Sequence, residues 1–171
     1  MEESNMLLEL VPWLIFLHTL SAFTFFFAHG TSVAMAFKIR SETNFDRIRA
    51  MLDLSASTVM IMLYSFLVMG LTGLILPFMM KLWNRGWIWA SIILMVAVFF
   101  RMVLMNETRY KMLRKLVGLP YMQGAKDFPA EPPSSQAEVE AYLKNLKVGE
   151  LVIVGYGIPM IVLWLMVFKP F

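Results

Sequence analysis

The chain has 171 residues, of which 59% are hydrophobic and only 16% are charged, and its mean hydropathy is +0.67. A soluble domain of this length needs more polar surface, so the composition excludes an ordinary soluble globular protein and indicates a membrane protein. The chain has no cysteine, which excludes disulfides, thiolate metal sites and iron–sulfur clusters. The formal net charge of +3 is small, and it favours contact with anionic lipid headgroups over binding of nucleic acid.

Four apolar windows predict four transmembrane helices. In chain order the windows are 10–37, 54–80, 86–106 and 151–168. A helix needs roughly 20 apolar residues to cross about 30 Å of hydrocarbon, and we expect each window to span, although Arg101 interrupts the third near its inner end. The first residues, MEESN, are acidic where a cleavable signal peptide is basic, so we expect the first helix to stay in the mature protein. The prediction is a single all-α domain over 1–171, an integral membrane four-helix bundle.

The second helix is expected to begin before its apolar window. Thr43 and Asp46 match the T-x-x-D pattern of a capping box. From Phe45 onward, Ile48 and Leu52 keep a helical spacing. The sequence therefore predicts a helix that extends out of the membrane on the side of the first loop.

The segment 107–149 is expected to form the inner part of the domain, between the third and fourth spans. Residues 108–122 are basic and amphipathic, which predicts a helix that lies on the inner membrane surface. The prolines within 129–133 break helices and predict an extended connector. Ser135 and Glu138 match another capping box, which predicts a short helix that leads into the last span.

Basic residues are distributed unequally between the two sides of the membrane. The first and third loops with their flanks contain twelve: Lys38, Arg40, Arg47, Arg49, Arg101, Arg109, Lys111, Arg114, Lys115, Lys126, Lys144 and Lys147. The opposite side contains three: Lys81, Arg85 and Lys169. Because cytoplasmic loops of membrane proteins are enriched in lysine and arginine, we predict that both chain ends lie outside. We expect the bacterial cytoplasmic (inner) membrane as the location.

Both histidines of the chain, His18 and His29, lie in the first window. Their spacing corresponds to three helical turns plus about 20°, so we expect both on one face, about 16 Å apart. An imidazole that faces lipid is unfavourable, so this face is expected to look into the bundle or towards a partner subunit. Because neutral imidazole is a common axial ligand, one hypothesis is a b-type haem site that uses His18, His29 or both.

The alternative role for His29 is structural, and the same holds for several other residues. His29 would donate to a hydroxyl on a neighbouring helix, with Gly30 allowing a close approach. The hydroxyls available are those of Ser55, Ser57, Thr58, Tyr64 and Tyr156. Gly70 and Gly73 are expected to let helices approach closely, and Pro159 is expected to kink the last helix. Arg101 is interpreted as snorkelling to the inner headgroups, with an ion pair to Asp53 as the alternative.

Methionine is abundant, with sixteen residues in the chain. Thioether ligands suit Cu(I), but methionine also fills gaps in apolar cores. Met60 and Met62 are two residues apart and Met79 and Met80 are adjacent, so neither pair points in one direction on a helix. The core interpretation is therefore favoured over a copper site.

Several stretches together resemble a known group of membrane proteins. They are LHTLSAFTFFFAHGTSVAMAFKIR, DRIRAMLDLS, LTGLILP, NRGWIWASIIL and LWLMVFKPF. Over nearly the whole chain this pattern resembles an uncharacterised bacterial family of four-span predicted integral membrane proteins of unknown function. It is more distantly similar to the membrane domain of copper resistance protein D, whose first helix also begins with an L-H motif, here Leu17-His18. The resemblance implies the fold and the membrane location but transfers no activity or catalytic residue.

The sequence contains no nucleophile–base pair, phosphate-binding loop or metal-ligand cluster, so an enzyme with protein-only catalysis is not expected. The first functional hypothesis is a non-catalytic integral membrane subunit that packs within a larger assembly, such as an energy-transducing one. Its expected partners are membrane lipids and other membrane subunits or a second copy of the chain. The second hypothesis is a redox protein with haem b at His18 or His29. Transport of copper or a small molecule ranks third, because few polar residues are available to line a path.

Overall fold

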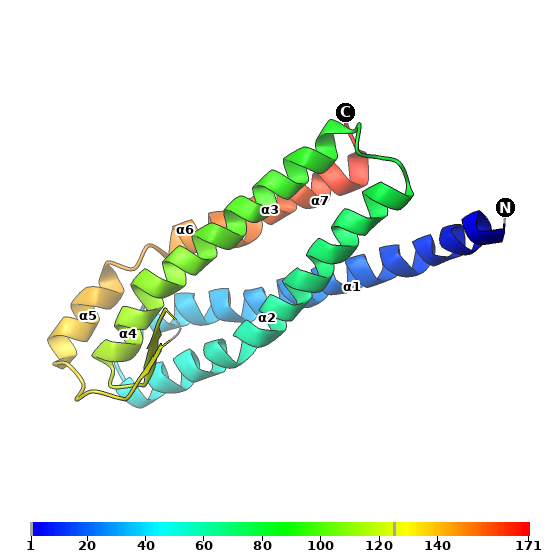
Figure 1. The fold of residues 1–171 in the computed structure, drawn as a ribbon. Coiled ribbons are helices and arrows are strands. Elements are labelled where there is room, and N and C mark those ends of the chain that lie inside the picture. Colours follow the sequence, from blue (N-terminus) through cyan, green and yellow to red (C-terminus); the bar gives the residue numbers. More distant parts are fainter. Residues whose placement is uncertain (1, 125) are drawn as a thin grey trace.

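The computed structural model describes residues 2–124 and 126–171, and for residues 2–8 and 107 it describes the backbone alone. Figure 1 shows that long helices dominate the chain. These helices are α1 (Glu2–Ile39), α2 (Phe45–Met79) and α3 (Gly86–Met105), which continues through the π-helix η1 (Asn106–Tyr110) into α4 (Lys111–Leu116). The last long helix consists of α6 (Val148–Val152), the π-helix η2 (Ile153–Gly157) and α7 (Ile158–Phe168).

The predicted all-α architecture is confirmed, and the four apolar windows lie on four long helices. Among the described residues, the helices Glu9–Ile39, Phe45–Met79, Gly86–Leu116 and Val148–Phe168 are long and apolar enough to cross a membrane. This indicates a multi-pass membrane protein. All four helices extend beyond the predicted windows at the end of the bundle that holds the first loop and segment 107–149.

The four long helices are arranged as two antiparallel pairs. α1 packs on α2, and α3 packs on α7, while α1 also contacts α6. Figure 1 shows that α1 begins and α7 ends at the same end of the bundle, and that the short helix α5 (Gln136–Lys144) lies at the opposite end. We refer to the end that holds α5 as the inner end.

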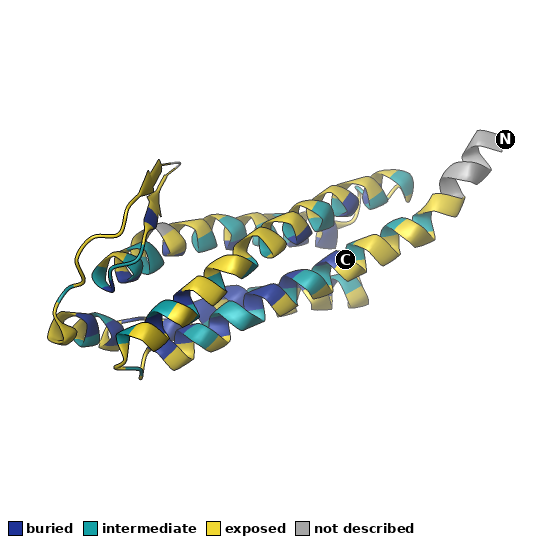
Figure 2. Ribbon diagram, turned by 90° about the horizontal axis from the view of Figure 1, so that it is seen from below, coloured by how far each residue is buried: buried dark blue, intermediate teal, exposed yellow. Residues whose placement is uncertain are grey.

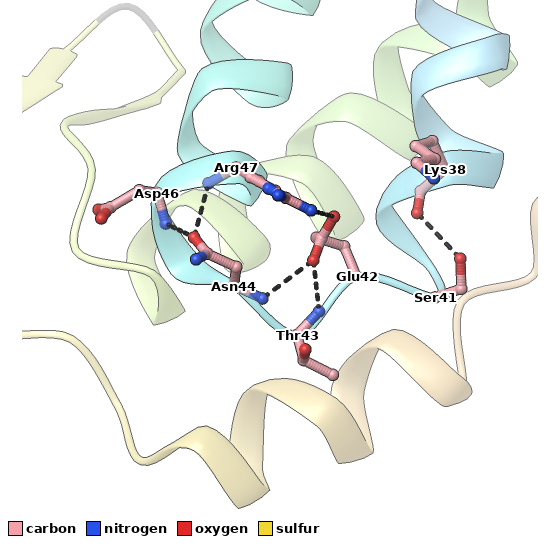
Figure 3. Close-up of polar contacts among 7 residues, drawn as sticks. All are labelled: Lys38, Ser41, Glu42, Thr43, Asn44, Asp46 and Arg47. Carbon is pink, nitrogen blue, oxygen red and sulfur yellow. Dashed lines mark hydrogen bonds and ion pairs between the residues drawn. The ribbon is translucent and has the colours of Figure 1, made fainter.

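The turn between α1 and α2 is held by two side chains that accept hydrogen bonds from the backbone (Figure 3). Glu42 Oε1 accepts from the amides of Thr43 and Asn44 at 3.1 and 3.2 Å. Asn44 Oδ1 accepts from the amides of Asp46 and Arg47 at 2.9 and 3.1 Å. Asn44 is therefore the N-cap of α2, and the capping box predicted for Thr43 and Asp46 is wrong by one position. Asparagine is a stronger N-cap than threonine, which explains the shift.

The inner segment differs from the prediction in its first half. The helix expected to lie on the membrane surface instead continues the line of α3 as far as Leu116 (Figure 1). It is followed by a β-hairpin that the sequence did not predict, in which β1 (Tyr121–Gln123) pairs antiparallel with β2 (Lys126–Phe128). The proline-rich stretch 129–135 has no regular secondary structure, as expected. The capping box of Ser135 and Glu138 is also confirmed, and it begins α5.

The main hydrophobic core lies at the inner end, where α1, α2, α4, α5 and α6 converge. Its buried residues are Val33, Ala36, Ile39, Ile48, Leu52, Met105, Leu113, Val117, Val139, Leu143, Leu146, Val148 and Leu151. Polar contacts close this end: Arg49 Nε donates to the carbonyl of Val117 at 2.7 Å, and Arg114 Nη1 lies 2.9 Å from Asp53 Oδ1. These contacts join α2, which follows the first loop, to the inner segment. Both regions therefore lie at one end of the bundle.

Many residues along the long helices are exposed (Figure 2), and many of these are large hydrophobic residues. Only 11% of the residues in the apolar windows of α1 and α2 are buried within the chain, against 33% in the window of the last helix. A smaller core of Trp87, Ile88 and Leu165 joins α3 to α7 near the opposite end. The bundle is thus closed at its inner end and presents apolar helix faces along the rest of its length.

We predict that Leu143→Ala destabilises the protein by about 2–5 kcal/mol, because it opens a cavity in the inner core where Leu143 is only 1% exposed. Met122→Ala is the matched control, because Met122 is 57% exposed and its truncation leaves no cavity. Thermal unfolding of the two variants in the same detergent measures the difference. Equal loss of stability in both variants would show that the inner core does not hold this end together.

Candidate functional site

His18 is held against α2 by its Nδ1 atom. Nδ1 lies 3.0 Å from the carbonyl oxygen of Met69 and 3.0 Å from Thr72 Oγ1. A carbonyl oxygen only accepts, so Nδ1 carries the proton and donates, and Nε2 carries the lone pair. Thr72 Oγ1 in turn donates to the carbonyl of Val68 at 2.7 Å. The ring is therefore fixed in one tautomer by the neighbouring helix.

His29 is buried, with an exposed fraction of 3%, and lies against the last helix rather than against α2. Its ring stacks on Phe25, with centroids 5.9 Å apart, and is tilted against Tyr156 at 5.8 Å. Its Nε2 atom has no hydrogen-bond partner among the described residues. The expected bond from His29 to a hydroxyl is not formed among the described residues; Ser55 and Thr58 pair with Ser32, and Ser57 donates to the carbonyl of Leu54.

Glycine residues on the last helix and on α1 make room for these contacts. An added Cβ at Gly155 would lie 1.8 Å from His29 Nε2, and one at Gly30 would lie 2.7 Å from the Tyr156 hydroxyl. Gly30 therefore allows the close approach that the sequence predicted. Gly155 lies within η2, so the π-helix presents its backbone directly to the imidazole. This contact joins the two helix pairs of the bundle.

The sequence also predicted structural roles for Gly70, Gly73 and Pro159, and the structure does not confirm all of them. An added Cβ at Gly73 would lie 3.1 Å from His18 Cε1, so Gly73 does permit a close approach. Gly70 has nothing within 4 Å of an added Cβ, so its predicted role in helix packing within the chain is wrong. Pro159 follows η2 directly. Because proline lacks an N–H, the carbonyl of Gly155 loses its helical donor at this point, where η2 interrupts the regular α-helix. The predicted kink stays a prediction.

Arg101 forms an ion pair that the sequence did not predict. Its Nη2 contacts Glu150 Oε1, and Nη2 of Arg109 contacts the other oxygen, Oε2, of the same carboxylate. The proposed alternative pairing of Arg101 with Asp53 is wrong, because Asp53 lies against Arg114. The predicted snorkelling of Arg101 to the inner headgroups stays a prediction; its side chain pairs with Glu150 and is 40% exposed. The signal that sequence reasoning missed is a single carboxylate at the start of the last apolar window.

The backbone around Arg109 is fixed from the inner side. The hydroxyl of Tyr142, on α5, donates to the carbonyl oxygen of Arg109 at 2.9 Å. Burial raises the pKa of the Tyr142 phenol, so it keeps its proton and remains a donor. The third long helix, the last long helix and α5 therefore meet at the cluster of Arg101, Arg109 and Glu150, which we call the arginine–glutamate cluster.

The described residues contain no group of three or more His, Cys, Asp or Glu side chains that could hold a metal ion. Comparison of the chain with family models, with curated proteins and with solved structures finds no match. The functional argument therefore rests on the geometry of the histidines, of the arginine–glutamate cluster and of the exposed helix faces.

We predict that Gly155→Ala destabilises the protein by about 1–3 kcal/mol, because the added methyl group overpacks the contact with His29. Gly149→Ala is the control: it lies on the same long helix, and nothing lies within 4 Å of its added Cβ. The measurement is the unfolding midpoint of each variant in detergent.

Replacing His29 by alanine removes the ring that the new methyl group would meet. The double variant His29→Ala/Gly155→Ala is therefore expected to lose less stability than the sum of the two single losses. Additive losses would contradict the contact.

Proposed function

We propose that the chain is a non-catalytic membrane subunit whose α1–α2 pair packs against an apolar helix of another membrane protein. The observation that carries this proposal is Tyr64, which is 65% exposed near the middle of α2. Its phenol makes no hydrogen bond to any described residue. A hydroxyl without a partner in an apolar environment is unfavourable by about 1–3 kcal/mol, so a partner that accepts from Tyr64 would remove a penalty that lipid tails cannot remove.

The other exposed hydroxyls of α1 and α2 differ from Tyr64 because they are satisfied within their own helices. Thr19, Thr24 and Thr31 donate to the carbonyls four residues earlier at 2.8, 2.9 and 3.1 Å, and Ser57 donates to Leu54 at 2.7 Å. A phenol held away from the backbone by its ring has no such local acceptor. Tyr64 is therefore the polar group on this face that needs an external partner.

A groove beside Tyr64 supports the same proposal. It has a volume of about 380 Å³ and is lined from α1 by Leu17, Leu20, Ser21 and Thr24, and from α2 by Ile61, Tyr64, Ser65 and Val68. The small side chains at its floor leave room for a ridge of apolar side chains, as at other helix contacts in membranes. A transmembrane helix laid along this groove would also reach the phenol at its rim.

The proposal also includes the orientation of the chain in the membrane and the membrane in which it lies. The first loop and the inner segment lie at the same end of the bundle, and they hold most of the basic residues of the chain. We infer that this end faces the cytoplasm, that both chain ends lie outside, and that the membrane is the bacterial inner membrane. We also propose that the chain is related to the bacterial four-span family that it resembles. The assembly that it joins is proposed to be an energy-transducing one.

We predict that a photo-reactive residue at position 71 forms a covalent adduct of protein size in native membranes, while one at position 93 does not. Leu71 and Ile93 are matched in exposure, at 61% and 66%, but only Leu71 lies on α2. Mass spectrometry of the adduct identifies the partner, and an adduct of twice the chain mass would show self-association. Absence of protein adducts at both positions would contradict the proposal.

A second candidate function is haem binding at His18, and the tautomer of this residue favours it. Histidine ligands usually donate their other ring N–H to a carbonyl or carboxylate, and His18 Nδ1 donates to the carbonyl of Met69. Haem held by Nε2 would supply a one-electron couple. His29 fits less well, because its Nε2 lies against the backbone of Gly155, so the last helix would have to move aside. Its role as a ligand stays a prediction, and so does the third-ranked hypothesis of copper or small-molecule transport.

We predict that His18→Ala removes a b-type spectrum if the protein binds haem, whereas His29→Ala retains it. The measurement is the dithionite-reduced minus oxidised visible spectrum of protein purified from cells supplied with haem, with haem quantified against protein. A flat spectrum of the unmodified protein would exclude this second function.

A further inference from the structure

Two guanidinium groups share one carboxylate in the arginine–glutamate cluster. Glu150 offers one oxygen to Arg101 and the other to Arg109, so the three side chains together carry one excess positive charge. Each guanidinium group offers five N–H donors, whereas one carboxylate offers only about four acceptor sites, so Glu150 cannot satisfy both forks. The cluster therefore lacks one negatively charged hydrogen-bond acceptor.

Arg109 shows where that acceptor is missing. Its Nη1 atom is buried and has no hydrogen-bond partner among the described residues. A charged donor that is removed from water without a partner is unfavourable. The nearby hydroxyl of Tyr142 donates to the carbonyl of Arg109 and does not accept from Nη1. An orphaned guanidinium nitrogen next to an excess positive charge is the arrangement that an anion would complete.

The depth of the cluster in the membrane indicates which anion lies nearest to it. Arg101 lies about 22 Å along the third helix from Gly86, and Arg109 lies about 34 Å from it. These positions bracket the end of a hydrocarbon layer about 30 Å thick. Glu150 lies at the beginning of the last span, which starts at Val148. The cluster is thus at the level of the lipid phosphates at the inner end of the bundle.

We propose that the arginine–glutamate cluster binds a phosphate group, supplied by an anionic lipid headgroup at the inner membrane surface. The side chain of Arg101 is 40% exposed and that of Arg109 is 23% exposed, so the phosphate approaches from the Arg101 side. Its oxygens accept from the guanidinium forks in competition with Glu150, and the buried Nη1 of Arg109 reaches them when its fork turns away from Glu150. Planar guanidinium groups match phosphate oxygens in this way. The π-helix η1 carries Arg109, and such helices are frequent at functional sites.

The test compares lipid-dependent thermal stabilisation of the full chain in detergent. Phosphatidylglycerol, phosphatidylcholine and inorganic phosphate are titrated separately. We expect phosphatidylglycerol to raise the unfolding midpoint of the unmodified protein at lower concentration than phosphatidylcholine does. Arg109→Gln is expected to weaken the phosphatidylglycerol response about tenfold, the loss of one charge-assisted hydrogen bond. A response to inorganic phosphate equal to that of phosphatidylglycerol would support the phosphate site but assign it to a soluble ion.

Arg114→Gln is the matched control. Arg114 is also a basic residue of the inner end, its side chain is 21% exposed, and it also forms an ion pair. We expect its phosphatidylglycerol response to equal that of the unmodified protein. Equal responses of the unmodified protein to both lipids, or equal weakening by both arginine substitutions, would overturn the proposal, because they would show general attraction to a basic surface.

Glu150→Gln separates binding from a purely structural role and does not depend on Arg109→Gln being stable. It removes the charge that competes with the phosphate but keeps a side chain of the same size. We therefore expect this variant to bind phosphatidylglycerol at least as tightly as the unmodified protein, although its stability without lipid is lower. Loss of lipid binding in Glu150→Gln would overturn the proposal. Native mass spectrometry of the retained lipid gives an independent readout.

Discussion

The carboxylate of Glu150 fixes how the third and last long helices meet. An unpaired charge at this depth is unfavourable, so the helices are held in the register that brings both arginines to the carboxylate. Arg101 and Arg109 are eight residues apart, which in a regular α-helix would leave their side chains about 80° apart around the axis. Residues in a π-helix turn by less because its hydrogen bonds close over five residues. η1 therefore returns Arg109 towards the face of Arg101, and its irregular geometry has a structural reason.

The position of α1 depends on contacts of another kind. Its histidines join it to two different helices: His18 to the backbone of α2 through a hydrogen bond, and His29 to the last helix through the space left by Gly155. In a membrane the hydrophobic effect does not drive helices together, so small residues and polar contacts decide which faces meet. The two histidines lie three turns apart on similar faces of α1. His18 nevertheless places α1 against α2, whereas His29 places it against the last helix.

The spans and most helix starts follow from the sequence because hydropathy and capping are local properties. The pairing of Arg101 was not predictable in the same way. Asp53 and Glu150 are both near the inner boundary, and only the three-dimensional arrangement decides that Asp53 meets Arg114 while Glu150 meets Arg101. The same applies to Gly70 and Gly73, which are chemically identical and three residues apart, yet only Gly73 faces His18. The continuation of α3 to Leu116 was missed because an amphipathic basic pattern suits both a surface helix and a helix that packs on an inner core.

These constraints divide the molecule into two parts with different needs. The inner end buries its own core and joins its helices by ion pairs, and one guanidinium nitrogen of Arg109 there has no partner among the described residues. Towards the other end, α1 and α2 present apolar faces with a phenol at mid-depth, and no residue described in this chain satisfies that phenol. Lipid tails match the apolar faces but offer no acceptor, whereas a helix with a carbonyl or hydroxyl at this depth matches both. The architecture therefore favours a protein partner on the α1–α2 face, where the hydroxyl of Tyr64 needs an acceptor within the apolar layer. It favours a lipid phosphate at the inner end, where the guanidinium group of Arg109 needs an anion at the level of the headgroups.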